Sequence, residues 1–493
     1  MTHRGTKLLA TVAVPAAIWL GCAPDLRVGE PPGSGGAGGI GGGVGGGASG
    51  EGGGAGGGAG GGVGGGAQGL PVWSRAFGGE GDQAGIAVAA DSAGNLVVVG
   101  QLGGSADFGG DTLESAGSDD IFVAWLDADG GVTRRMRFGD GNPQEVRAVA
   151  LRGDGGVLLA GSMSGTLDFG GETWTSAGGR DGYVAKLGPD GEPAWGLRFG
   201  DAGYQVATGV TVDAAGNVMV AGVFSGEVAL GDVVTSAGGY DALVAKLGVD
   251  GTPLWSRKFG GALDQRAHGI AADMAGGAVV VGEFAGIMDT GGSSVESAGA
   301  EDAFAVKIGA GGDVIWSRRY GDAKAQVARR VAADGEGGVV IGGEFVGSVD
   351  LGGGPLAGSG LGGLFVGRID GDGNHVWSKG FPGSGASRLE GLAVDEEGGV
   401  VITGVLAGSL EIGEEVLVSV GEEDLFAARL DASGRVLWAR RFGDGAAQRG
   451  QGVAVDGAGA AVVVGRFAGT LEIGGETLES VGNHDALMLK LSR

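Results

Sequence analysis

The 493-residue sequence contains little of what most disulfide and metal sites require: it has one cysteine and four histidines, which lie far apart along the chain. A single cysteine excludes an intramolecular disulfide framework and a cysteine-based zinc site. Proline, with 11 residues, and aromatic residues, at 6%, are also scarce. No G-x-S-x-G, H-E-x-x-H or P-loop phrase is present. The sequence therefore offers no catalytic motif, and we expect no metal or other cofactor.

Positive charge is scarce as well. The chain has 33 lysines and arginines against 59 aspartates and glutamates, which gives a formal net charge of −26. Such an acidic surface repels phosphates, so we expect no nucleic-acid partner. Glycine, by contrast, accounts for 119 residues, and 43% of the chain is hydrophobic. That hydrophobic content is too high for a chain that is disordered throughout.

The first 22 residues are typical of an export signal, because two positive residues precede an apolar run from 8 to 20. This run is shorter than the about 20 residues that cross a bilayer. The four residues ending on Cys22 resemble the lipobox of bacterial lipoproteins, with Trp19 where that family usually has leucine. The resemblance implies lipidation of Cys22, and the alternative is a free cysteine beside an ordinary cleavage site. Ala23 instead of aspartate then implies the outer membrane or cell surface.

Residues 23–69 are expected to form a flexible tether. Glycine occupies 25 of the 37 positions from 33 to 69, and such a segment cannot build a core. A wall-interacting segment is the alternative. We expect the tether to hold a folded body, residues 70–493, away from the membrane to which the lipid anchors it.

From residue 70 onward one unit recurs seven times. Its aromatic landmark falls at Phe77, Phe138, Phe199, Phe259, Tyr320, Phe381 and Phe442, in steps of 61, 61, 60, 61, 61 and 61 residues. Each unit holds four alternating stretches separated by Gly and Asp turns, which predicts four short strands and no helix. Seven such units predict an all-β fold, a seven-bladed β-propeller of four-stranded antiparallel blades. A β-solenoid is the alternative.

The two ends of the repeat region favour ring closure. The region begins on a fourth-strand phrase, 72–77, and ends just after a third-strand phrase, 485–491. We therefore expect the N-terminal strand to complete the last blade and to hide an edge that would otherwise promote aggregation. A monomer is expected.

The phrases DALVAKL, VDAAGNVMVAG and PLWSRKFG are similar to the SBBP repeats of bacterial surface and secreted proteins, and the resemblance covers all seven copies. It implies a β-propeller and an envelope location, but no activity. The fifth copy departs from it, with Gly363 where the other copies have aspartate. The unit also resembles the propellers of quinone-cofactor proteins, including outer-membrane assembly lipoproteins.

Three rows of recurring residues are interpreted as structural. Tryptophans open six of the fourth strands and are expected to pack between blades, with a carbohydrate-stacking row as the alternative. Aspartates at the end of the first strand are expected to bind turn amides. Glutamines six residues after the landmark are expected to satisfy backbone groups of the neighbouring blade. The loop DGDGN (370–374) resembles the start of a calcium loop, but Phe381 stands where the loop would need a glutamate.

One position varies where its immediate neighbours are mostly small or apolar. It lies three residues after the glutamine row, near the start of the predicted innermost strand, and holds Ile86, Arg147, Thr208, His268, Arg329, Glu390 and Gln451. Because a ligand site in a symmetric ring requires side chains that do not repeat, the six polar residues from Arg147 to Gln451 are the candidate ligand-binding residues. Their arginines, histidine and glutamate suit a carboxylate or a polar sugar. Solvated positions without a function are the alternative.

These observations favour a binding or scaffold module, tethered to the cell envelope, for a protein or glycan partner. The alternative is an enzyme, a lyase or hydrolase, acting on envelope polysaccharide at the mouth of the channel.

Overall fold

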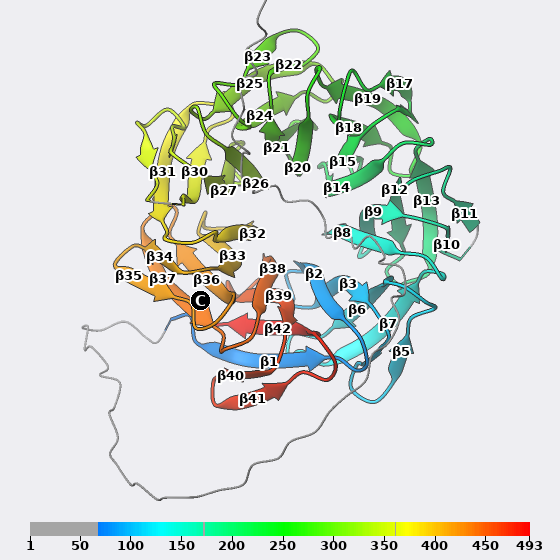
Figure 1. Cartoon of the computed structure of the whole chain (residues 1–493). Helices are drawn as coiled ribbons and strands as arrows, with labels where there is room; N and C mark the ends of the chain where they lie inside the picture. The colour runs from blue at the N-terminus through cyan, green and yellow to red at the C-terminus, as the bar shows by residue number, and fades with distance from the viewer. Residues whose placement is uncertain (1–67, 171–172, 360) are drawn as a thin grey trace, which may run out of the picture. The chain divides into compact units, whose positions relative to one another are not determined.

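The computed structural model describes residues 68–170, 173–359 and 361–493. The predicted signal peptide, Cys22 and the part of the predicted tether up to residue 67 lie outside the described residues. Within them, the repeats form seven four-stranded antiparallel sheets arranged as blades around a central channel, which confirms the predicted β-propeller (Figure 1). Among the described residues no helix is long and apolar enough to cross a bilayer.

The blades are numbered here by repeat, and each runs from the channel outward. The innermost strands are β2 (Gln83–Ala90), β8 (Gln144–Leu151), β14 (Gln205–Val212), β20 (Gln265–Ala272), β26 (Gln326–Ala333), β32 (Arg388–Val394) and β38 (Gln448–Val455). The second strands are β3 (Leu96–Leu102), β9 (Val157–Met163), β15 (Val218–Phe224), β21 (Ala278–Phe284), β27 (Val339–Phe345), β33 (Val400–Leu406) and β39 (Ala461–Phe467).

The outer half of each blade has the same regularity. The third strands are β6 (Asp120–Leu126), β12 (Asp181–Leu187), β18 (Asp241–Leu247), β24 (Asp302–Ile308), β30 (Gly363–Ile369), β36 (Asp424–Leu430) and β42 (Asp485–Leu491). The outermost strands are β7 (Val132–Phe138), β13 (Pro193–Phe199), β19 (Pro253–Phe259), β25 (Val314–Tyr320), β31 (His375–Pro382), β37 (Val436–Phe442) and, in blade 7, β1 (Pro71–Phe77).

Each blade also carries a two-stranded hairpin between its second and third strands, which the sequence pattern did not predict. The hairpins are β4 and β5 (Ser105–Asp107, Thr112–Glu114), β10 and β11 (Thr166–Asp168, Thr173–Thr175), β16 and β17 (Glu227–Leu230, Asp232–Thr235), β22 and β23 (Ile287–Asp289, Ser294–Glu296), β28 and β29 (Ser348–Val349, Leu356–Ala357), β34 and β35 (Ser409–Ile412, Glu415–Val418), and β40 and β41 (Thr470–Ile473, Glu476–Glu479). In blade 3 the hairpin binds the outermost strand, since Ser256 Oγ donates to the Asp232 carbonyl over 2.9 Å.

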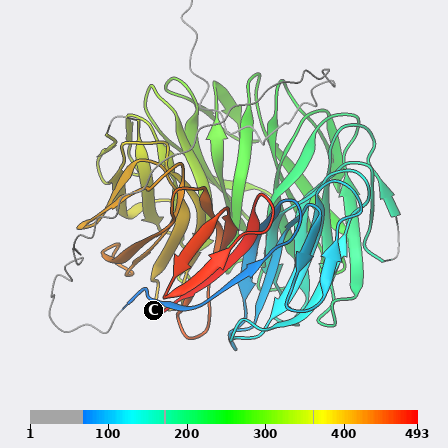
Figure 2. The same cartoon turned by 60° about the horizontal axis from the view of Figure 1, so that its bottom comes forward.

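The ring is closed by its N-terminal strand, as predicted. β1 pairs antiparallel with β42, with Trp73 opposite Lys490 and Phe77 opposite Ala486. The two strands lie side by side at the seam (Figure 2). Across the seam, Ser492 N donates to the Leu70 carbonyl over 2.8 Å.

The core lies between neighbouring blades, where the second and third strands are buried on both faces. Val98 and Phe122 of blade 1 pack with Val464 and Met488 of blade 7 in one apolar cluster. Burial of apolar area at about 25 cal/mol per Å² is the main force that holds blade on blade.

The tryptophan row contributes to these interfaces, as predicted. Trp316 Nε1 donates to the Gly371 carbonyl of the next blade over 3.0 Å, and Trp377 Nε1 to the Ala432 carbonyl over 2.9 Å. The ring of Trp316 also lies against Gly373, where a Cβ atom would approach it to 3.0 Å. Indole rings thus pack on the turns of neighbouring blades.

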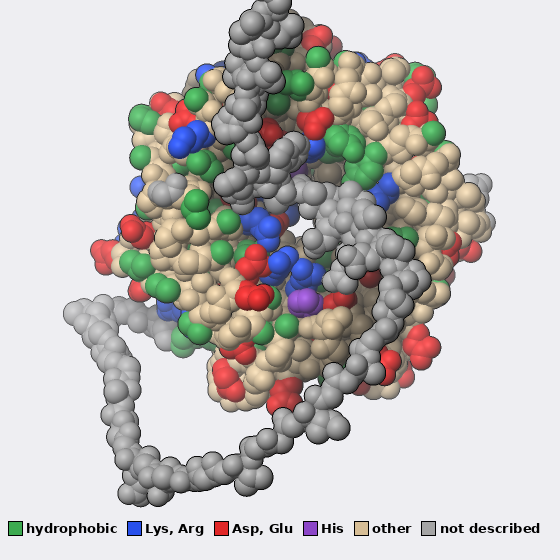
Figure 3. All heavy atoms as spheres, in the orientation of Figure 1, with side chains coloured by type: hydrophobic (Ala, Val, Ile, Leu, Met, Phe, Trp, Pro, Cys, Tyr) green, Lys and Arg blue, Asp and Glu red, His purple; other side chains and the backbone are tan. Residues whose placement is uncertain are grey.

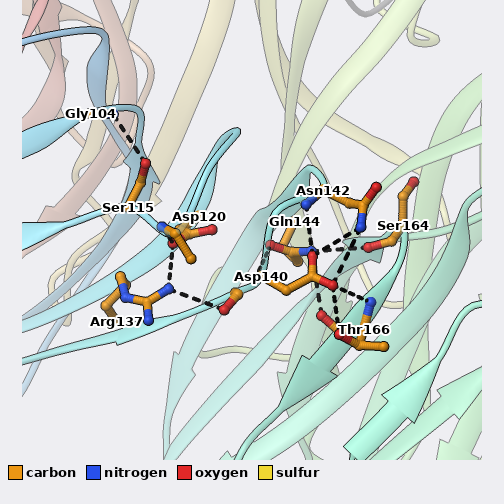
Figure 4. Close-up of polar contacts among 11 residues, drawn as sticks. Gly104, Ser115, Asp120, Arg137, Asp140, Asn142, Gln144, Ser164 and Thr166 are labelled. Carbon is orange, nitrogen blue, oxygen red and sulfur yellow. Dashed lines mark hydrogen bonds and ion pairs between the residues drawn. The ribbon is translucent and has the colours of Figure 1, made fainter.

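A second recurring arrangement lies at the junctions between blades, at the end of the channel where the innermost strands begin. In the junction of blades 1 and 2, buried Asp120 Oδ2 accepts hydrogen bonds from Ala116 N (2.7 Å) and Arg137 Nη1 (2.5 Å) (Figure 4). A Cβ atom on Gly139 would lie 2.3 Å from Asp120 Oδ1 and 2.5 Å from Gln144 Oε1, so only glycine fits between the two side chains.

The same Asp–Gly–Gln triplet occupies six of the seven junctions. Its members are Asp120, Gly139 and Gln144; Asp181, Gly200 and Gln205; Asp241, Gly260 and Gln265; Asp302, Gly321 and Gln326; Asp424, Gly443 and Gln448; and Asp485, Gly78 and Gln83. At the junction of blades 5 and 6 all three members change together, to Gly363, Pro382 and Ser387. There Ser387 Oγ donates to the Ala407 carbonyl over 3.3 Å, at the place of a glutamine amide.

The glutamines correct one prediction. Gln144 Nε2 donates to the Ser164 carbonyl over 2.9 Å, and its Oε1 accepts from Asp140 N over 3.0 Å (Figure 4). Both partners belong to its own repeat and to the loop that leads into it, not to the neighbouring blade. The reason is geometric, because the glutamine begins the innermost strand directly beside the end of its own second strand.

The junction triplet gives a stability prediction. Asp120→Ala should lower the free energy of unfolding by about 1–3 kcal/mol, because the amide of Ala116 and the Arg137 guanidinium both lose a buried carboxylate acceptor. Chemical denaturation followed by tryptophan fluorescence measures this. The matched control is Asp129→Ala, an exposed turn residue, which should unfold as the parent does. Equal stability of the two variants would show that the hydrogen bonds of Asp120 do not stabilise the fold.

Candidate functional site

The variable position of the sequence proves to be a β-bulge in all seven innermost strands. In each strand the pairing to the second strand skips this one residue; in β20, Ala267 pairs with Gly282 and Gly269 with Val281, which leaves His268 unpaired. The bulge residues are Ile86, Arg147, Thr208, His268, Arg329, Glu390 and Gln451. A bulge redirects its side chain, and bulges are frequent beside functional sites.

A glycine in every second strand accommodates the bulge. A Cβ atom on Gly282 would lie 1.9 Å from the carbonyl oxygen of Arg266, and one on Gly161 would lie 1.9 Å from the carbonyl oxygen of Glu145. Neither glycine has a positive φ. A glycine recurs at this position in all seven second strands, at Gly100, Gly161, Gly222, Gly282, Gly343, Gly404 and Gly465, and the close approach of the bulged strand explains why.

We call the end of the channel around the bulge residues the mouth. Lys and Arg, Asp and Glu, and His side chains gather around this opening (Figure 3). Arg147 is an exposed residue, whereas the other six bulge residues are half-buried. Ile86 packs against apolar neighbours, and Thr208 Oγ1 donates to the Ala267 carbonyl of the next blade over 2.8 Å. The side chains of two of the seven bulge residues, Ile86 and Thr208, thus make structural contacts.

On blades 4 and 5 the mouth is lined by His268 and by charged side chains in contact with one another. His268 Nε2 lies 3.5 Å from Glu283 Oε2, and Arg266 Nη1 lies 3.3 Å from Glu283 Oε1. Arg329 Nε lies 3.0 Å from Glu344 Oε2. We call these contacts, each of which lies within one blade, the charged network of the mouth.

The network also bridges the junction that lacks the Asp–Gly–Gln triplet. Arg330 Nε of blade 5 donates to the Glu390 carbonyl of blade 6 over 2.6 Å, and Leu389 N of blade 6 donates to Glu344 Oε1 over 2.8 Å. Arg330 stands where the other repeats have alanine or glycine. Two of the charged residues at the mouth, Arg330 and Glu344, therefore bind blade 5 to blade 6 at this junction.

Burial and neighbouring charges shift the pKa values of three groups at the mouth, His268, Glu344 and Arg330. Burial lowers the pKa of His268, although Glu283 opposes the shift, so the ring is largely neutral at pH 7. Burial raises the pKa of Glu344, with the Arg329 charge acting against it. Burial also lowers the pKa of Arg330, and the like charge of Arg147 acts in the same direction.

Sequence reasoning missed a second set of non-repeating residues at the mouth. The position directly after the glutamine row holds Glu145, Arg266, Arg388 and Arg449 in four of the repeats, and the position opposite it on the second strand holds Glu283, Glu344 and Arg466 in three. Comparing these two positions across the seven repeats would have revealed them, but their proximity to the bulge depends on strand register.

The remaining predicted rows have structural contacts. Asp213 Oδ1 accepts hydrogen bonds from the turn amides of Ala215 (2.9 Å) and Asn217 (2.8 Å), which confirms the prediction for the aspartate row. Asp370 of the DGDGN loop accepts from Asp372 N and Asn374 N in the same way, so that loop is a hairpin turn. Over residues 68–170, 173–359 and 361–493, no group of three or more His, Cys, Asp or Glu is arranged to hold a metal ion.

No protein-family model matches the sequence, and no curated protein matches it. Among solved structures, hydrazine synthase of Kuenenia stuttgartiensis is similar at 11% identity over 78% of this chain and 93% of that chain, with a TM-score of 0.43. A quinonprotein alcohol dehydrogenase-like protein of Bacteroides thetaiotaomicron is similar at 10% identity over 74% and 67%, with a TM-score of 0.35. The hemagglutinin-neuraminidase ectodomain of parainfluenza virus 5 is similar at 7% identity over 86% and 84%, with a TM-score of 0.40. Likeness at this level concerns architecture alone.

Proposed function

We propose that the propeller is a binding module and that its ligand, a protein or a glycan, binds at the mouth of the channel. The observation that supports this is the contrast between repetition and variation. The rows that build the scaffold recur from blade to blade, whereas the bulges and the positions beside them carry different polar side chains. A ring that only had to be stable would not need six different residue types at the seven bulge positions.

The proposal extends to where the module acts. The signal-like segment 1–22, the lipobox-like ending on Cys22 and the glycine-rich segment 23–69 support a protein that is exported, lipid-anchored and held at the outer membrane or cell surface. The SBBP-like phrases support the same location. The net charge of −26 supports a partner other than nucleic acid.

A crosslinking pull-down from the native envelope tests the binding site. We expect Arg147→Ala to reduce capture of the partner by about tenfold or more, since a charge-assisted hydrogen bond is worth about 1.5–3 kcal/mol. Arg147 is suited to this test because its side chain is 38% exposed and its partner Glu145 keeps a second ion pair with Arg180.

The matched control is Arg435→Ala. Arg435 lies in the turn between β36 and β37, at the opposite end of the channel, and its side chain is 75% exposed. Capture that falls equally in both variants would place the partner elsewhere than at the mouth. Turnover of an envelope polysaccharide by the parent protein would instead favour an enzyme.

A further inference from the structure

Two of the four tyrosines of the chain form an aromatic pair beside the mouth. The rings of Tyr204 and Tyr240 meet edge to face with centroids 5.4 Å apart, and both residues are half-buried. The other two tyrosines, Tyr183 and Tyr320, are buried in the interfaces between blades. At the position of Tyr204 the other repeats have Asp, Pro or Ala, and at that of Tyr240 they have Asp, Arg, Glu, Gly or His. The pair is therefore not required by the blade.

Arginines of the two neighbouring blades, 2 and 4, lie close to this pair on blade 3. Arg266 of blade 4 places its guanidinium carbon 5.3 Å from the centroid of the Tyr240 ring. Arg180 of blade 2 forms a β-bridge with Tyr204. The charges of Arg147 and Arg180 also act on the Tyr204 phenol, whose pKa burial raises and these two charges lower.

Acceptors are interleaved with these donors. Glu145 pairs with both Arg147 (2.5 Å) and Arg180, so it holds the two guanidinium groups in place and neutralises part of their charge. Around the same opening, the buried Oε1 of Gln451 has no hydrogen-bond partner. We call Glu145, Arg147, Arg180, Tyr204, Tyr240 and Arg266 the tyrosine–arginine platform.

We propose that the tyrosine–arginine platform binds an acidic oligosaccharide, with a sugar ring against Tyr204 and a uronate-type carboxylate on Arg147. This inference rests on the proposed function and names its ligand class. The negative face of a tyrosine ring attracts the C–H face of a sugar, and its hydroxyl remains free for a sugar hydroxyl. Guanidinium groups bind carboxylates through paired charge-assisted hydrogen bonds.

The interleaved acceptors favour a saccharide over an acidic peptide. Sugar hydroxyls donate and accept, so they can donate to Glu145 as well as accept from the arginines. Acidic side chains only accept, so Glu145 would repel them. The overall negative charge of the protein does not prevent such binding, because at physiological salt charges act over about 8 Å and the nearby arginines dominate.

Titration calorimetry of the full chain with hexagalacturonate tests the proposal. We expect measurable binding that weakens when sodium chloride is raised from about 0.05 to about 0.5 M. Arg147→Gln and Tyr204→Ala should each weaken it about tenfold or more. The matched controls Arg435→Gln and Tyr320→Phe, whose altered groups lie away from the platform, should stay within about twofold of the parent.

Other outcomes would overturn the proposal. Equal binding of hexaglutamate would show carboxylate recognition without a saccharide, and equal binding of a neutral cellohexaose would show that the arginines do not select an acid. Absence of hexagalacturonate binding, with the Arg147-dependent capture from the envelope intact, would reject the acidic glycan but keep the mouth as the binding site. Binding unaffected by Arg147→Gln and Tyr204→Ala would reject the platform itself.

Discussion

Removal of the closing strand is expected to have the largest effect on this fold. A variant that begins at residue 78 lacks β1, so β42 loses its outer partner and the apolar cluster between blades 7 and 1 loses Phe77. Loss of one buried phenylalanine alone costs about 3–5 kcal/mol. The strand also supplies a backbone ladder that runs from Pro71 to Phe77. We expect a lower melting temperature and concentration-dependent aggregation, because β42 becomes an exposed edge.

The control for this experiment is a variant that begins at residue 68. It keeps β1 and the seam hydrogen bond between Ser492 and Leu70, so it should melt with the parent. Differential scanning calorimetry with light scattering measures both quantities. A ring without β1 that stays monomeric and as stable as the control would show that the blades hold one another without closure.

Ring closure could be predicted from the sequence because it depends only on the order in which the strand segments follow one another along the chain. The repeat period of about 61 residues and the fourth-strand phrase at 72–77 determine how many blades form and which one is incomplete. The hairpins were missed for the opposite reason. Strands as short as Ser348–Val349 do not alternate long enough to form a pattern, and only their contacts with the outermost strand reveal them.

The candidate site was predicted in part. The variable position was recognised because the neighbouring residues are mostly small or apolar. The bulge at this position follows from strand register, which no single residue encodes. The partners Glu283 and Glu344 stand on the second strand, and their proximity to His268 and Arg329 is a property of the paired strands. The platform tyrosines lie in two separate loops of blade 3, and only the fold brings them together.

The other large effect is expected at a glycine that allows the bulge. Gly282→Ala places a methyl group 1.9 Å from the Arg266 carbonyl and 2.7 Å from the Phe304 ring, both in the interior of blade 4. Backbone cannot give way as a flexible side chain can, so the bulge must shift or the blade must open. Overpacking of this kind costs about 1–3 kcal/mol and occasionally more. We expect reduced stability in chemical denaturation.

The site should change with it. Because His268 is the bulge residue, a straightened β20 would move its ring out of its buried position. Burial is the main cause of the lowered pKa, so an NMR titration would then find the His268 pKa closer to the ordinary 6.5. Gly292→Ala is the matched control, since a Cβ there meets no atom within 4 Å and the residue has no positive φ. Parent-like stability and an unchanged His268 pKa in Gly282→Ala would mean that the glycines do not govern the bulges. If the stability and the pKa change together, the recurring glycines and the varying bulge residues are two parts of one device, in which a constant scaffold presents different side chains at the mouth.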